Sequence, residues 1–195
     1  MRTLKLLIVT QYFPPEIGAL ASRWGDFSKI LANLDHKVTV LCESPHYPNE
    51  KYYPGFKNSF ISINNINSNL TVIHSKAFAS DRKTSLKKLC HYIIFMLSAI
   101  INLRKIKNFD IMIISSPPLF TGVIGLYAKI FLKHNYWLDI RDLWPDSALE
   151  LNQIGKRLYK YGKFLEKKIY KNAKGFIFPV PGFKNYFSNF SKEIR

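Results

Sequence analysis

Short, nearly continuous apolar runs alternate along this chain with segments in which apolar residues recur every three or four positions. The first two runs cover residues 5–10 ("KLLIVT") and 37–43 ("KVTVLCE"). Between them, residues 21–36 follow a helical spacing that puts five apolar side chains on one face: Trp24, Phe27, Ile30, Leu31 and Leu34. Two strands joined by such a helix predict a βαβ unit with parallel strands.

The alternation continues to the end of the chain. Further strands are predicted at residues 70–75, 110–116, 135–142 and 175–180, helices at 84–107, 117–134 and 155–173, and a last helical turn at 181–187. Residues 44–60, dense in Pro, Tyr and Asn, and residues 143–150 are predicted to be loops. This order predicts an α/β fold with a parallel sheet flanked by helices.

Prolines mark the segments that follow the predicted strands: "QYFPPEIG", "SPHYP", "SSPPLFTG" and "DLWPD". In an open α/β sheet such segments lie at the carboxyl edge of the strands, where ligands bind, and proline leaves them little entropy to lose. His46 lies on this rim. Gly18 precedes a helix whose first amides can donate to an anion such as phosphate; the alternative, that Gly18 only turns the chain, stays open.

The predicted helix at 84–107 contains the apolar run "LCHYIIFMLSAIINL" between two groups of basic residues. This run is roughly 15 residues long, shorter than the ~20 that span a bilayer. It is either a core helix covered on all sides or an interfacial helix in the headgroup layer, and the flanking charges favour the second. The membrane-facing residues would then be Lys83, Lys87, Lys88, Arg104 and Lys105.

Charge adds the expectation of an anionic partner. The chain has 29 Lys and Arg against 13 Asp and Glu, a formal net charge of +16, and a second basic cluster covers residues 155–174. Nucleic acid, anionic lipid and phosphorylated small molecules are all candidates. A non-catalytic basic binding module is therefore the alternative function, although no helix-turn-helix, RRM or zinc-finger pattern supports nucleic-acid binding.

Several chemistries are excluded by the motifs. There is no P-loop and no GxGxxG motif. Asp139 and Asp142 flank Arg141, which would neutralise a metal site, so no metal is expected. Cys42 and Cys90 show no CxxC pairing and are expected to be buried thiols in a reducing compartment. The N-terminus lacks a small-residue cleavage site, which favours a cytoplasmic protein.

Five motifs in order carry a resemblance to a known family: "LLIVTQYFPPEIGALASRW", "VLCESPHYPNEKYYPGF", "SSPPLFTG", "DIRDLWPDSALEL" and "PGFKNYF". Together they resemble the N-terminal domain of bacterial family 4 glycosyltransferases. The subgroup that the chain looks like makes O-antigen, a part of lipopolysaccharide, and capsule polysaccharide, and transfers sugars such as N-acetylated amino-deoxyhexoses. The resemblance covers residues 1–195 and implies one Rossmann-like, acceptor-binding domain of a GT-B fold.

The resemblance also implies a mechanism and partners. It implies a retaining transfer, without metal or other cofactor, from a nucleotide-sugar to a polyprenyl-diphosphate-linked sugar, on the cytoplasmic face of the cell membrane and without nucleic acid. The loop that approaches the donor diphosphate would be Pro15, Glu16, Ile17, Gly18 and Ala19. The cleft and acceptor residues would be His46, Tyr47, Ser116, Pro117, Arg141, Asp142 and Trp144; no catalytic residue is assigned.

The chain departs from the family pattern in three places. Gly18-Ala19 stands where many relatives have Gly-Gly, and Arg141 stands where many have a histidine that faces the donor sugar. Relatives also continue beyond the position of Arg195 into a second, donor-binding domain. The chain alone is therefore expected to be inactive in transfer, whether it is a fragment, one half of a split enzyme or a half-domain reused for binding.

Overall fold

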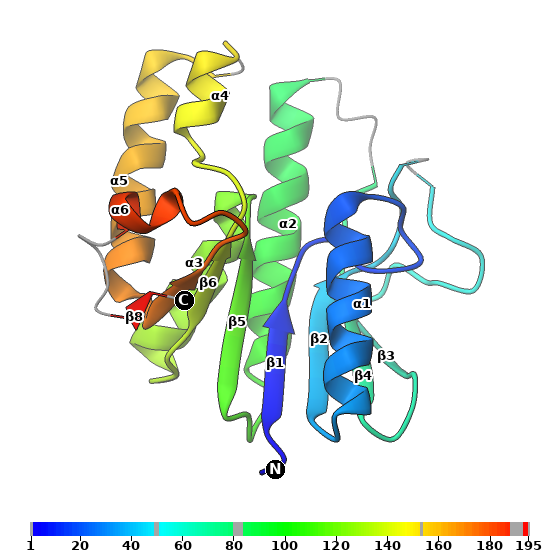
Figure 1. Ribbon diagram of the computed structural model, residues 1–195. Helices are drawn as coiled ribbons and strands as arrows, with labels where there is room; N and C mark the ends of the chain where they lie inside the picture. Colours follow the sequence, from blue (N-terminus) through cyan, green and yellow to red (C-terminus); the bar gives the residue numbers. More distant parts are fainter. Residues whose placement is uncertain (1, 49–50, 80–83, 153, 188–192, 195) are drawn as a thin grey trace. The chain divides into compact units, whose positions relative to one another are not determined.

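Figure 1 shows the computed structural model, which describes residues 2–48, 51–79, 84–152, 154–187 and 193–194. The chain forms two compact units, Met1–Met112 (the first unit) and Ile113–Arg195 (the second unit). The assignment of residues 1–195 to one acceptor-binding domain stays a prediction.

The first unit contains β1 (Lys5–Val9), α1 (Ala19–Asn33), β2 (Lys37–Glu43), β3 (Ile61–Asn65), β4 (Leu70–Ser75) and α2 (Ser85–Leu103). Its strands follow the order β3-β4-β2-β1. β1, β2 and β4 are parallel, and β3 is antiparallel to β4. Backbone hydrogen bonds from Thr10 to Leu41 and from Glu43 to Gln11 continue the pairing of β1 and β2. The loops that follow these two strands therefore start side by side.

The second unit contains α3 (Leu119–Phe131), β6 (Trp137–Ile140), α4 (Asp146–Glu150), α5 (Lys156–Asn172), β7 (Gly175–Ile177), α6 (Phe183–Phe187) and β8 (Glu193–Ile194). β5 (Ile111–Ser116) crosses the boundary between the units. The parallel strands β5, β6, β7 and β8 are neighbours in that order. The Tyr136 hydroxyl donates to the Ile169 carbonyl of α5 at 2.6 Å, and both residues are fully buried.

Small residues let α3 lie close to this core. A Cβ atom on Gly122 would come within 2.9 Å of the Ile169 side chain, and one on Gly125 within 2.8 Å of the Tyr136 ring. Such distances are shorter than real Cβ contacts, so any larger residue would force the helix away.

A group of polar side chains, the lysine cluster, joins three helices of the second unit. Lys163 of α5 pairs with Glu166 and lies 2.9 Å from Asp146 of α4 and 3.0 Å from the Tyr186 hydroxyl of α6. The Tyr159 hydroxyl donates to Asp146 at 2.8 Å. Burial opposes the charge of Lys163, but its hydrogen bonds to Glu166, Tyr186 and Asp146 raise the pKa of the ammonium group above its ordinary value. Lys163 is therefore charged at neutral pH.

One strand was missed by the sequence analysis, and one predicted loop is wrong in part. Residues 61–65 form β3, which was not predicted because an exposed edge strand with the sequence "ISINN" lacks a continuous apolar run. Residues 146–150, predicted as part of a loop, form the single-turn helix α4. The predicted strands at 37–43 and 70–75 are confirmed to the residue as β2 and β4.

The predicted apolar face of α1 is also wrong for most of its members. Trp24 is buried, but Phe27, Ile30 and Leu34 are 47%, 55% and 55% exposed. The buried stripe consists instead of small residues and Trp24: Ala21, Trp24, Gly25, Ser28 and Ala32. A Cβ atom on Gly25 would lie 2.6 Å from the Pro14 ring, so the close approach of α1 to the loop after β1 selects small side chains over large apolar ones.

Helix α2 packs one face on β2 and β4 and leaves the other exposed. His91, Phe95 and Ala99 are buried, whereas Leu86 is 69% and Leu97 51% exposed. The interpretation as a core helix covered on all sides is therefore wrong. By length and composition alone, residues 86–103 are apolar enough to cross a membrane, but 33% of them are buried in the fold. A sheet-packed helix with an apolar outer face is compatible with the interfacial prediction.

Candidate functional site

One carboxylate joins the two loops that follow β1 and β2. Glu16 is only 4% exposed. Its Oε1 accepts hydrogen bonds from the backbone amides of His46 (3.0 Å) and Tyr47 (2.9 Å), and its Oε2 accepts one from the amide of Phe13 (3.3 Å). Amide hydrogen bonds to an ionised carboxylate are stronger than those to a neutral acceptor. Glu16 therefore fixes the "SPHYP" loop against the loop "QYFPPEIG".

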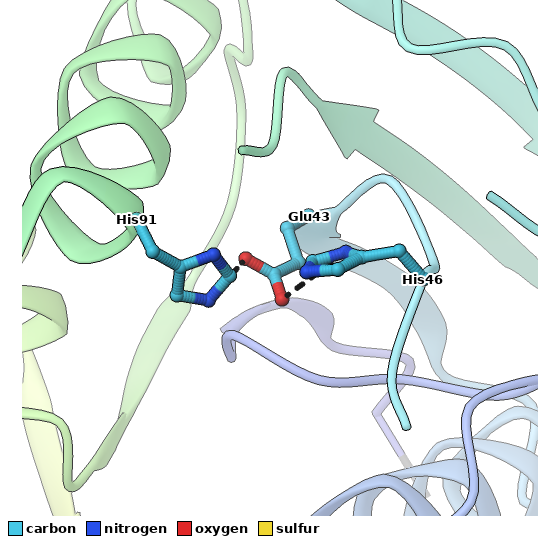
Figure 2. Close-up of side chains that lie close together, drawn as sticks. All are labelled: Glu43, His46 and His91. Atoms are coloured by element: carbon cyan, nitrogen blue, oxygen red, sulfur yellow. Dashed lines mark ion pairs between the residues drawn. The ribbon is translucent and has the colours of Figure 1, made fainter. Parts of the chain in front are cut away.

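A buried group of polar side chains lies next to Glu16, with His46 Nδ1 3.9 Å from Glu16 Oε1. Figure 2 shows three members of the group, Glu43, His46 and His91. His91 of α2 lies 3.4 Å from Glu43 Oε2 at the end of β2, and His46 Nδ1 lies 3.8 Å from Glu43 Oε1. The Gln11 amide lies between two of these groups, 3.1 Å from Glu43 Oε2 and 2.5 Å from His91 Nε2. We call these four residues and Glu16 the carboxylate–histidine cluster.

Backbone carbonyls set the tautomers of both histidines. His91 Nδ1 lies 3.0 Å from the Phe78 carbonyl, and His46 Nδ1 lies 3.0 Å from the Ser44 carbonyl. When neutral, each ring donates from Nδ1 and keeps a lone pair on Nε2. His91 Nε2 can then accept a hydrogen bond from the Gln11 amide.

Three residues of the carboxylate–histidine cluster are possible ligands for a metal ion. The donor atoms of Glu43, His46 and His91 all lie within 4.8 Å of one another, and all three side chains are buried. The Gln11 amide already bridges Glu43 and His91, so hydrogen bonds join these side chains to one another in the structure. The expectation that the protein needs no metal or other cofactor stays a prediction.

Aromatic rings surround this cluster. Tyr12 stacks on His91 with ring centroids 6.4 Å apart and lies 5.5 Å from the ring of Tyr47. Tyr52 lies 5.9 Å from the ring of His46 and donates to the Ala77 carbonyl. Burial raises the pKa of the Tyr52 phenol. Tyr47 is 40% exposed, so this wall presents an aromatic surface to solvent beside the loop that Glu16 holds.

The five residues of the predicted diphosphate loop do not all face solvent. Pro15, Ile17 and Ala19 are exposed and Gly18 is half-buried, but Glu16 turns inward to backbone amides. Gly18 has an extended backbone, and a Cβ atom there would lie 3.7 Å from the Tyr47 ring, an ordinary contact. The backbone therefore does not require glycine for a turn, and the role of this loop in anion binding stays a prediction.

Among the predicted cleft residues of the first unit, His46 and Tyr47 are brought together with Glu16. His46 is fully buried, so it supports the loop from within, whereas the neighbouring Tyr47 faces solvent. The predicted membrane-facing residues Lys87, Lys88, Arg104 and Lys105 are exposed at the two ends of α2. Lys83 lies outside the described residues.

In the second unit, the predicted residues follow the ends of β5 and β6. Ser116 pairs with Ile140 in the sheet, and its carbonyl accepts a hydrogen bond from the Arg141 amide at 3.0 Å. Pro117 is half-buried beside them, Arg141 is half-buried and Asp142 is exposed. Trp144 packs near Gly162 of α5, where an added Cβ would lie 3.2 Å from its ring. Ser116 and Arg141 are thus adjacent, and Trp144 supports the helix.

Sequence reasoning missed Gln11, Glu43 and His91 as site residues. In the sequence, His91 has no potential partner at an informative spacing. The available signal was the presence of polar residues in apolar segments: a histidine within the apolar run of α2 and a glutamate at the end of a buried strand. Buried polar groups of this kind need hydrogen-bond partners. Cys42, predicted to be buried, is fully buried, and burial, with Glu16 and Glu43 nearby, raises the pKa of its thiol; Cys90 is half-buried.

Comparisons with known proteins show the fold. No family model matches the chain, and no curated protein matches it. Among solved structures, the chain is similar to the catalytic domain of starch synthase IV from Arabidopsis thaliana bound to ADP and acarbose, with a TM-score of 0.63 and 12% sequence identity. The match covers 97% of this chain and 51% of that one, so this chain spans about half of that structure. The predicted α/β, Rossmann-like fold of a GT-B domain is confirmed.

Proposed function

We propose that this chain is the acceptor-binding half of a retaining glycosyltransferase. The observation that carries the proposal is the fold likeness, over 97% of the chain, to a starch synthase domain that was solved with ADP and acarbose. In this proposal the donor is a nucleotide-sugar, and the acceptor is a polyprenyl-diphosphate-linked saccharide used to make surface polysaccharide such as O-antigen or capsule. The sequence motifs given above support this subgroup.

The carboxyl ends of β1 and β2 support a binding role. Glu16 and the carboxylate–histidine cluster hold two loops in fixed positions at the edge where α/β sheets bind ligands. The exposed members of this edge, Tyr47, Ile17 and Ala19, are the groups that a sugar or diphosphate would contact. A preformed loop loses little entropy when it binds.

Transfer itself would depend on stabilising the departing nucleoside diphosphate. The first amides of α1 can donate to its phosphate oxygens, because no side chain caps this helix. The donor-binding half of the cleft would be contributed by a second domain, so this chain alone would bind the acceptor without transferring sugar.

The proposed location is the cytoplasmic face of the cell membrane. The outer face of α2 is apolar, and Lys87, Lys88, Arg104 and Lys105 stand exposed at its ends. A helix of this kind lies in the headgroup layer and pairs its terminal cations with anionic lipid.

The test measures acceptor binding by isothermal titration calorimetry, with a water-soluble farnesyl-diphosphate N-acetylglucosamine as the probe. We expect binding that Tyr47→Ala weakens about tenfold, while Lys29→Ala, a change on the exposed side of α1, leaves it unchanged. Absence of binding, or equal affinity in all variants, contradicts the proposal. A second measurement incubates the chain with UDP-sugars and the probe and looks for the product by mass spectrometry. Sugar transfer by this chain alone would contradict the proposal that it holds only the acceptor-binding half of the enzyme.

A further inference from the structure

The outward face of α5 exposes large apolar side chains on a helix that is firmly packed on its other side. Gly162, Glu166, Ile169 and Tyr170 are buried. On the opposite face, Tyr161 is 74% exposed, Phe164 61% and Leu158 51%. A soluble surface does not gain from such exposure, because apolar area in water costs free energy. The outward face of α5 is therefore a candidate interaction surface; the helix itself is drawn in orange in Figure 1.

Cations surround these apolar groups. Six basic residues of α5 are exposed: Lys156, Arg157, Lys160, Lys167, Lys168 and Lys171. The one acidic residue within α5 is Glu166, which is buried and paired with Lys163. The outward face of this helix, all of whose residues are described, therefore carries positive charge without a carboxylate. Its binding partner must be anionic.

The cations and rings share one stripe rather than lying on separate sides. Arg157, Lys160, Tyr161 and Phe164 line a shallow hollow of about 580 Å³. The Lys168 ammonium lies 4.6 Å from the centroid of the Phe164 ring. Spacings of three and four residues keep these groups on one face of the helix.

We propose that the outward face of α5 docks on an anionic lipid surface. Tyr161, Phe164 and Leu158 would enter the headgroup layer, and the surrounding lysines and arginine would pair with lipid phosphates. A nucleic acid also offers phosphates, and its bases stack on aromatic rings, but it gives no apolar environment to Leu158. The mixture of aliphatic, aromatic and basic side chains therefore favours a membrane.

This inference rests on the proposed function, because a lipid-linked acceptor is presented at such a surface. It proposes a lipid-binding helix in the second unit, in addition to the lipid-binding role proposed for α2 in the first unit. The two units then each have a helix suited to the headgroup layer.

The test is sedimentation of the chain with vesicles of phosphatidylcholine and phosphatidylglycerol (1:1) in 0.15 M salt. We expect Tyr161→Ser/Phe164→Ser and Lys160→Glu/Lys168→Glu each to weaken binding tenfold or more. The matched control is Lys29→Glu/Lys57→Glu, which changes the net charge equally at exposed positions of the first unit and should weaken binding less than threefold. Circular dichroism melts check that each variant is folded.

Three results would overturn the proposal: no binding of the unchanged chain, an equal loss in the control pair, or no loss in the Tyr161/Phe164 pair. A fourth is loss of single-stranded DNA binding in the α5 variants with vesicle binding intact, which would assign the face to nucleic acid. Failure of the proposed function is distinguishable: acceptor-probe binding, measured without vesicles, would be absent while vesicle binding still depended on α5.

Discussion

Each unit of this protein contains a cluster of charged side chains, and the two clusters differ in their partners. In the first unit, Glu16 of the carboxylate–histidine cluster bonds to three backbone amides in two loops. In the second, the lysine cluster connects side chains of α4, α5 and α6. A carboxylate on backbone amides fixes loop conformation, whereas paired side chains fix how helices pack. The first cluster therefore fixes the conformation of loops, and the second fixes the packing of helices.

The clusters also differ in exposure, which sets the size of their effects. The side chains of Glu16, Glu43, His46 and His91 are inaccessible to solvent, whereas those of Lys163 and Asp146 are 30% and 29% exposed. Breaking a fully buried charged group costs more than breaking a partly hydrated one, because water cannot replace the lost partner. This difference orders the predictions that follow.

The largest effect is expected for Glu16→Ala. The change leaves three amides without their acceptor, two of them in the "SPHYP" loop. We expect a loss of roughly 3 kcal/mol in the free energy of unfolding, measured by urea denaturation. Binding of the acceptor probe should fall as well, because the loop loses its fixed position.

Glu16→Gln is the matched control. Its remaining amide oxygen can still accept from His46 and Tyr47, both of which bond to Oε1. We expect about half of the destabilisation seen with alanine. If alanine and glutamine variants were both within 0.5 kcal/mol of the unchanged protein, a margin set by ordinary surface substitutions, Glu16 would not hold the loops.

A smaller effect is expected for Lys163→Met in the second unit. The change leaves Glu166 and Asp146 facing each other without the ammonium group between them. Because the site is partly hydrated, we expect a loss of about 1–2 kcal/mol in the same denaturation experiment. Acceptor-probe binding by folded protein should be unchanged, in contrast to Glu16→Ala.

The double variant Lys163→Met/Glu166→Leu sharpens this prediction. Removing both charges takes away the buried carboxylate that the single change leaves behind, so stability should recover at least half of the loss. No recovery would mean that Lys163 acts through Asp146 and Tyr186 rather than through Glu166.

The sequence predicted most of the fold because most of its signal is local. The largely apolar sequences of β2 and β4 give their bounds directly, since parallel strands buried on both faces are rich in Val, Ile and Leu. β3 was not predicted because an edge strand need not be apolar. The buried face of α1 was not predicted because its Gly25 packs against Pro14 of the loop, whereas the apolar Ile30 is exposed.

The candidate site was predicted only in part, for a reason of distance along the chain. His46 was identified from its loop, but its cluster forms through contacts between residues far apart in sequence. Gln11 and His91 are 80 residues apart, and Gln11 and Glu43 are 32 apart. Such contacts depend on strand register and on how α2 crosses the sheet, and no local spacing encodes either.

The smallest effect is expected from pH, through His74 at the end of β4. His74 Nδ1 lies 3.2 Å from the carbonyl of Glu43, a member of the carboxylate–histidine cluster, and 3.4 Å from the Cys42 sulfur. Burial lowers the pKa of His74 below its ordinary 6.5, although the hydrogen bond to the Glu43 carbonyl partly opposes this shift. The unfolded chain therefore binds a proton at higher pH than the folded protein does. Stability should fall as pH decreases below about 6.5 and stop falling below the lowered pKa.

His74→Asn isolates this contribution, because its side-chain amide can still donate to the Glu43 carbonyl but does not titrate. We expect the free energy of unfolding of this variant to decline less between pH 7.5 and 5.5, by an amount below about 1.4 kcal/mol, the value of one pKa unit. Every other histidine is present in both proteins, so the difference between the two curves belongs to His74. If the two curves of stability against pH were parallel, burial would not lower the pKa of His74. The end of β4 would then be hydrated enough for the His74 ring to accept the proton.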